Sequence, residues 1–95
     1  MAYIVRYLKS VGNKDIPKLK KSGIDLEALY RNLKKLKTNP YTSSRAKTGD
    51  LQGYRAMDFN KGYRLVFKID EETKEVIILS IDCHDTAYKN AKKRC

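Results

Sequence analysis

The segment GYRLVFKIDEETKEVIILSIDCHDTAY (62–88) is the most informative about the fold, because it holds two apolar runs separated by a short polar stretch. In the first run, YRLVFKI (63–69), large apolar residues alternate with Arg64, Val66 and Lys68, which is typical of a strand with two different faces. The second run, VIILSID (76–82), is apolar at consecutive positions, as in a central strand covered on both faces. We therefore expect an antiparallel hairpin here.

Two further strands are predicted outside this segment. YRAMDF (54–59) precedes the turn Asn60-Lys61-Gly62 and should pair with 63–69, which makes a meander. AYIVRYL (2–8) is rich in β-branched and aromatic residues and predicts a strand at the N-terminus. The chain therefore has four expected strands.

Helices are predicted on both sides of the meander. Residues 14–21 predict a short helix with Pro17 in its first turn. Residues 25–37 predict a longer one, whose apolar stripe consists of Leu26, Leu29, Leu33 and Leu36. A long polar loop is expected over 39–53, and a short C-terminal helix over 85–93, which Asp85 can cap.

This order, β-α-α-β-β-β-α, indicates a single α+β domain over residues 1–95. We expect a small, twisted, mainly antiparallel sheet with the two N-terminal helices on one face and the other face partly open. Tyr63, Leu65, Phe67 and Ile69 should then face the helices, with Arg64 on the open face. In the last strand, alternation places Val76, Ile78, Ser80 and Asp82 together, and His84 continues that set toward Arg64.

The charge of the chain is strongly basic. Lysine and arginine number 21 against 11 acidic residues, a net charge of +10, and residues 31–49 contain no acid at all. Such a field favours a polyanionic partner, meaning RNA, DNA or an acidic protein. No apolar run approaches the roughly 20 residues of a membrane span. The N-terminus lacks the pattern of a signal peptide, so we expect a cytoplasmic protein without a membrane partner.

The cysteines and the single histidine do not predict a metal site. Cys83, Cys95 and His84 fall short of any common zinc spacing, so neither a metal nor a cofactor is expected. Cys95 is the last residue printed, and a structural disulfide is not expected in a reducing compartment. We interpret Cys83 as a core residue rather than a nucleophile.

The order of elements, with GYRLVFKID followed by VIILSIDCHDTAY, resembles the RelE/ParE superfamily of bacterial toxins. The likeness is greatest to the RelE and YoeB branch, the mRNA interferases. It covers nearly the whole chain, and its specific part runs from 51 to 89. The shared pattern is a strand with a basic residue (Arg55), a hairpin with Gly62 and Arg64, an apolar strand, and then His84 and Tyr88.

The resemblance implies a RelE-like fold, cleavage of mRNA on the ribosome and an acidic antitoxin as partner. The toxin alone would be a monomer that forms a hetero-oligomer with the antitoxin. This chain has His84 where RelE-like members carry arginine. It has no clear counterpart of the carboxylate base of YoeB-like members, so the resemblance identifies no general base.

RNA can be cut without a metal when the ribose 2′-OH attacks the adjacent phosphorus. The reaction needs a base, an acid and cations that stabilise the phosphoryl oxygens. His84 is the only side chain here whose ordinary pKa lies near neutrality, so we expect it to act as the acid or base. Asp82 or Asp85 would orient it.

Cationic and aromatic residues complete the expected site. Arg64 and Arg55 would hold the phosphate, since a guanidinium binds phosphate bidentately. Lys47 would neutralise the transition state or act as base, and Tyr88 would stack on a base or contact the phosphate. The expected RNA-binding residues are Lys34, Lys37, Arg45, Lys61 and Lys89.

Each of these residues has a structural alternative, and the function has two. A lone histidine after a strand is most often structural, Arg64 could be a surface residue, and Tyr88 could only pack the last helix. Tyr30, Leu29 and Leu33 are interpreted as core or antitoxin-contact residues. The alternative functions are a ParE-type inhibitor of DNA gyrase, which is not an enzyme, and an RNA-binding module without catalysis.

Overall fold

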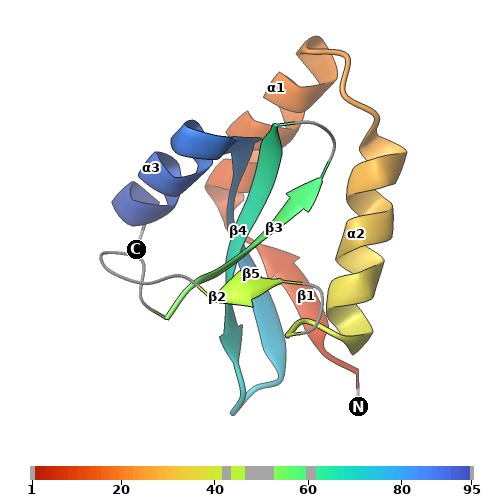
Figure 1. Cartoon of the computed structure of the whole chain (residues 1–95), viewed down its shortest axis with the longest axis vertical. Coiled ribbons are helices and arrows are strands. Elements are labelled where there is room, and N and C mark those ends of the chain that lie inside the picture. The colour runs from red at the N-terminus through yellow and green to blue at the C-terminus, as the bar shows by residue number, and fades with distance from the viewer. Residues whose placement is uncertain (1, 42–43, 47–52, 60–61, 95) are drawn as a thin grey trace.

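The computed structural model of the chain describes residues 2–41, 44–46, 53–59 and 62–94, with His84 as backbone alone. A sheet of five strands forms its centre (Figure 1), in the spatial order β1-β5-β4-β3-β2. The strands are β1 (Ile4–Tyr7), β2 (Arg45–Ala46), β3 (Arg55–Phe59), β4 (Tyr63–Asp70) and β5 (Glu75–Cys83). β1 pairs with β5 in parallel, and the other neighbours are antiparallel.

The helices lie on both sides of this sheet, as Figure 1 shows for α2 and α3. They are η1 (Val11–Asp15), a π-helix, followed by α1 (Ile16–Lys21), α2 (Leu26–Thr38) and α3 (His84–Arg94). Asp25 begins α2 by accepting the backbone N–H of Glu27 at 2.9 Å. The predicted start of the first helix at residue 14 was late, because η1 already begins at Val11. None of the helices in the described ranges is long and apolar enough to cross a membrane.

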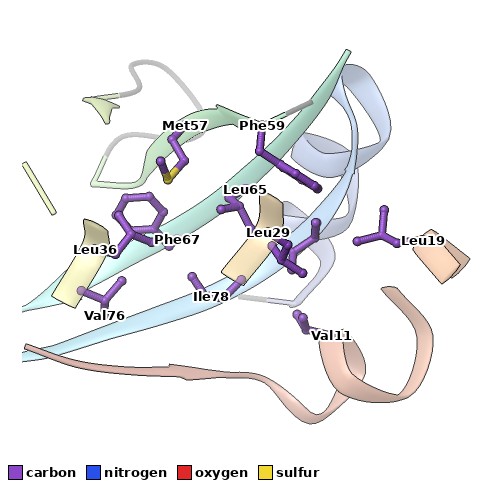
Figure 2. Packing of buried hydrophobic residues seen from close by; sticks show 11 residues of the cluster. Val11, Leu19, Leu29, Leu36, Met57, Phe59, Leu65, Phe67, Val76 and Ile78 are labelled. Carbon is purple, nitrogen blue, oxygen red and sulfur yellow. The ribbon is translucent and has the colours of Figure 1, made fainter. Parts of the chain in front are cut away.

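The larger core lies between the sheet and the N-terminal helices, on what we call the α2 face. Leu29 and Leu36 of α2 are fully buried against Phe67 and Val76 of the sheet (Figure 2). Burying each such side chain contributes about 1.5–3 kcal/mol to stability. The expected inward set of β4 is confirmed, since Tyr63, Leu65, Phe67 and Ile69 all belong to or pack on this core.

A second, smaller core lies under α3, on what we call the α3 face. Ala87 and Ala91 of α3 are fully buried against Val66, Ile77 and Leu79. The hydroxyl of Ser80, also fully buried, donates to the carbonyl of Ala87. Alanine lets the helix approach the sheet closely, so α3 covers part of the face that we expected to be open. β5 is thereby covered on both faces, as its consecutive apolar residues predicted.

An irregularity in the β4–β5 ladder overturns one predicted parity. Val66 pairs with Ser80 whereas Phe67 pairs with Ile78, so Leu79 is an additional residue in β5. Such a bulge moves every later side chain to the other face. Ser80 and Asp82 therefore do not share the face of Val76 and Ile78, and Asp82 lies opposite Arg64 on the α3 face.

Two further expectations were wrong. Residues 39–53 were predicted to be loop throughout, but Arg45–Ala46 forms the short edge strand β2 against β3. A two-residue strand carries no periodicity that a sequence pattern could reveal. Cys83 was interpreted as a core residue, yet it is an exposed free cysteine at the end of β5. The buried part of β5 ends one residue before Cys83, at Asp82.

Candidate active site on the α3 face

Asp58, Arg64 and Tyr88 form a cluster where β3, β4 and α3 meet, which we call the Arg64 cluster. The guanidinium Nε of Arg64 is 2.7 Å from Oδ1 of Asp58, and Nη1 donates to the Tyr88 hydroxyl at 3.0 Å. The guanidinium carbon lies 5.9 Å from the centre of the Tyr88 ring. The side chain of Arg64 is 22% exposed and that of Asp58 is 56% exposed. The cluster is therefore ordered by its own contacts and open to solvent.

The β3–β4 hairpin builds this cluster. Gly62 adopts a φ of +80°, a conformation that suits glycine, and the strands pair Phe59 with Tyr63 and Asp58 with Arg64. Opposed side chains on neighbouring strands lie on one face within contact distance. Tyr88 reaches the same place from α3 because Ala87 and Ala91 anchor that helix on the sheet.

His84 is the first residue of α3 and follows β5 directly, one helical turn before Tyr88. Its backbone thus lies at the same end of the sheet as Arg64, since β4 and β5 pair Tyr63 with Cys83. The side chain of His84, and Lys47 and Lys61 as whole residues, lie outside the part of the chain that the structure describes.

Asp82, one of the two acids that we expected could orient His84, instead contacts Lys18. Its carboxylate is buried, with Oδ2 2.9 Å from Nζ of Lys18, and Oδ1 accepts the N–H of Cys83. The hydrogen bond to Asp82 raises the pKa of Lys18. Asp85 is exposed at the start of α3. The geometry thus gives Asp82 a structural role that joins β5 to α1.

Arg55 lies on the opposite face of the sheet from Arg64. It pairs with Phe67, whose side chain is in the core on the α2 face. Its Nε donates to the Ser44 hydroxyl at 2.7 Å, and Nη2 donates to the carbonyl of Tyr41 at 3.0 Å. Its guanidinium also lies 5.1 Å from the centre of the Tyr41 ring. The structure thus does not bring Arg55 and Arg64 together on one phosphate; Arg55 fastens the segment after α2 to β3.

The expected RNA-binding residues also divide between the two faces. Arg45 pairs with Ala56, which belongs to the core under α3, so it lies on the α3 face. Lys89 follows Tyr88 on α3 and is exposed. Lys34 and Lys37 instead lie on α2, where they line a groove with β1.

The sheet beyond the C-terminal end of α3 is hollowed. A cavity of about 380 Å³ lies there, with the aromatic ring of Tyr54 and the cation of Lys68 in its wall. The other residues of its lining are Arg6, Leu8, Ile77, Leu79 and Arg94.

No group of three histidine, cysteine or acidic side chains that could hold a metal occurs among the residues described.

Asp58 is the residue of this site that sequence reasoning missed. The signal was present, because the turn predicted at Asn60-Lys61-Gly62 is compatible with the pairing that the structure has, Phe59 with Tyr63 and Asp58 with Arg64. The expected site was built from basic residues and the histidine, and it included no acidic residue of 54–59.

Comparison with known proteins shows the family. A model of the ParE-like toxins of type II bacterial toxin–antitoxin systems matches residues 7–92. The chain belongs to this family of toxins. A Methanocaldococcus jannaschii protein that carries the name Putative toxin RelE4 is 27% identical over 92 residues, which cover 97% of this chain and 89% of that protein.

Solved structures of toxins have the same fold. The toxin–antitoxin complex RelBE2 of Mycobacterium tuberculosis contains a chain with a TM-score of 0.74 and 26% identity; the match covers 88% of this chain and all of that one. The DinJ–YafQ toxin–antitoxin complex of E. coli gives 0.74 at 17% identity, covering 93% and 99%. The α+β architecture predicted from the sequence is thus that of RelE-like toxins.

Proposed function

We propose that this toxin is a metal-independent endoribonuclease that cleaves mRNA, on translating ribosomes, by attack of the 2′-OH on the adjacent phosphorus. The observation that carries this proposal is the contact of Arg64 with Tyr88 on the α3 face of the sheet. The start of α3, which holds His84, lies at the same end of the sheet.

Each of the grouped residues has a place in this chemistry. Arg64 binds the scissile phosphate, and its guanidinium has more N–H groups than the two contacts to Asp58 and Tyr88 use. Tyr88 positions that guanidinium and offers its ring to an RNA base. His84 donates a proton to the leaving 5′-oxygen, and Lys47 neutralises charge on the phosphoryl group.

We further propose an acidic antitoxin as partner and mRNA on the ribosome as substrate. A groove of about 500 Å³ lies between β1 and α2, and the exposed Tyr7 and Tyr30 form part of its apolar wall. Its cations are Arg31, Lys34 and Lys37, against one acid, Glu27. An extended segment with apolar and acidic side chains would match both the groove and the outer edge of β1.

A ParE-type role remains the second candidate, because the matching family model is that of ParE-like toxins. That role is the inhibition of DNA gyrase by binding. In that role Arg64, Tyr88 and His84 would not act together in a chemical reaction.

The test is cleavage of a defined mRNA by the purified protein, with and without programmed ribosomes, with the cut ends mapped. Arg64→Ala and His84→Ala should each lower the rate roughly 10²-fold or more, since a phosphate-binding cation and a general acid each contribute that much. Arg6→Ala is the matched control, because Arg6 makes the same 2.7 Å Nε contact to a carboxylate, Glu75, on another strand pair.

The two candidate functions give different results. Cleavage that depends on Arg64 and His84 but not on Arg6 supports the nuclease. Failure of the folded wild-type protein to cut RNA under either condition, together with inhibition of gyrase supercoiling, would replace it with the ParE-type role.

A further inference from the structure

From the geometry of the Arg64 cluster we infer that Asp58 is the general base of the cleavage reaction, which accepts the proton of the attacking 2′-OH. This inference rests on the proposed nuclease function. Its ground is the position of the Asp58 carboxylate, 2.7 Å from the guanidinium that holds the phosphate and 56% exposed on the same face. A base for this reaction must lie beside the phosphate and be reachable by the ribose.

Two buried acids and one acid of the β4–β5 turn are held by other contacts. Asp82 and Asp15 are buried in ion pairs with Lys18 and Arg94. Glu71 accepts hydrogen bonds at the turn between β4 and β5, the opposite end of the hairpin from Arg64. Asp58 is the carboxylate that the structure places in contact with Arg64.

The step balances without any further reactant. The 2′-OH proton passes to the Asp58 carboxylate while the bond from O2′ to phosphorus forms. The bond from phosphorus to O5′ breaks, and His84, protonated beforehand, gives its proton to that oxygen. The products are a 2′,3′-cyclic phosphate and a 5′-hydroxyl end, and solvent then restores both side chains to their starting protonation states.

The contact with Arg64 explains how a carboxylate can work beside a phosphate. The Asp58 carboxylate and the phosphate are both anions and would repel each other if nothing lay between them. The Arg64 guanidinium lies between them and can donate to both. Nε contacts the Asp58 carboxylate, and Nη1 donates to the Tyr88 hydroxyl. The guanidinium is partly exposed to solvent. One arginine would thus fix both the base and the phosphate that it acts on.

The first experiment replaces Asp58 by asparagine, which keeps the shape and an oxygen acceptor for Nε but cannot take a proton. The single-turnover rate of RNA cleavage should fall roughly 10²- to 10⁴-fold, as expected for loss of a general base, with little change in KM. Glu75→Gln is the matched control, since Glu75 makes the equivalent 2.7 Å contact with Arg6. Asp58→Glu should recover part of the rate.

A second experiment separates a base from an acid. In an RNA in which sulfur replaces the leaving 5′-oxygen, the leaving group needs no proton. Such a substrate should restore cleavage by His84→Ala and leave the defect of Asp58→Asn unchanged. Restoration of Asp58→Asn as well would assign Asp58 to the acid side and overturn the inference.

A third experiment separates a base from a residue that only positions Arg64. If Asp58 acts only through Arg64, then Asp58→Asn has no further effect in an Arg64→Ala background, and the inference is wrong. An additional fall in rate in the double variant supports the base. If the wild type and Glu75→Gln both fail to cut RNA, the nuclease function itself fails; if both cut and Asp58→Asn cuts equally well, only the role of Asp58 does.

Discussion

At the scale of single residues, the two ends of β4 carry charged clusters of different kinds. At one end Arg64 contacts Asp58 and Tyr88, and the group is open to solvent. At the other end Glu71 accepts hydrogen bonds from Tyr3, Tyr41 and Lys74, with the Lys74 and the shorter Tyr3 contact both at 2.7 Å. These partners come from three parts of the chain, so the second cluster ties the β4–β5 turn to the N-terminus and to the segment after α2.

The Glu71 cluster should make stability depend on pH in acid. Hydrogen bonds from Lys74, Tyr41 and Tyr3 lower the pKa of Glu71 from 4.5 to about 2. A lowered pKa means that the ionised form stabilises the fold above pH 4.5, and that this contribution disappears as the pH falls from there through about 2. Thermal unfolding at a series of pH values should therefore show a shallower acid dependence for Glu71→Gln than for the wild type. Glu72→Gln, beside it in the same turn, is the matched control with the same change in charge.

At the scale of elements, α3 is held at both of its ends. Its first half is anchored by Ala87 on the sheet, and its last residue, Arg94, donates to both carboxylate oxygens of Asp15 in η1 at 2.8 and 3.0 Å. Oδ2 of Asp15 also accepts the N–H of Ile81 at 2.8 Å, at a point in β5 beyond the pairing with β1. One carboxylate thus completes the sheet edge and fixes the helix that carries Tyr88.

Removal of this carboxylate should strongly destabilise the fold. Asp15→Ala removes the buried carboxylate that accepts hydrogen bonds from both Nη groups of the partly buried Arg94 and from the N–H of Ile81, so the free energy of unfolding should fall by about 3–5 kcal/mol. Urea titrations followed by circular dichroism measure this decrease. Glu75→Ala, which removes one partner of the more exposed pair with Arg6, should cost about 0–1 kcal/mol. Equal decreases in the free energy of unfolding would show that the Asp15 carboxylate contributes no more to stability than the more exposed Glu75 carboxylate does.

At the scale of the whole molecule, the basic charge of the chain is divided between two faces. Arg45 and Lys89 lie with Arg64 on the α3 face, and Lys34 and Lys37 lie along the groove between α2 and β1. The sheet lies between the two groups, so they do not form one continuous basic surface. Net charge alone would not have shown this division.

Charge reversal on each face tests the division. The double variant Arg45→Glu with Lys89→Glu should weaken binding of a fluorescent single-stranded RNA and lower the slope of log affinity against log salt by about 2, roughly one for each phosphate that the protein no longer neutralises. The double variant Lys34→Glu with Lys37→Glu has the same change in net charge and should bind RNA nearly as the wild type does. Fluorescence anisotropy across a salt series measures both; equal effects would mean that only the total charge matters.

Local sequence patterns were sufficient to predict the α+β class, the meander and the inward face of β4. Each of these follows from local regularities: alternation in 63–69, consecutive apolar residues in 76–82 and the leucine stripe of α2. The sequence also carries the family resemblance, because the order of elements and the positions of Arg64, His84 and Tyr88 are properties of the chain itself.

Which residues share a site, in contrast, depends on strand register and is visible only in the folded chain. The bulge at Leu79 turned Asp82 onto the α3 face, and strand pairing put Arg55 on one face and Arg64 on the other. A bulge changes the parity of every following residue without changing the composition of the strand, so no local pattern records it. The contact of Asp58 with Arg64 likewise depends on register between two strands, which is set by the turn and the packing of both faces rather than by either strand alone.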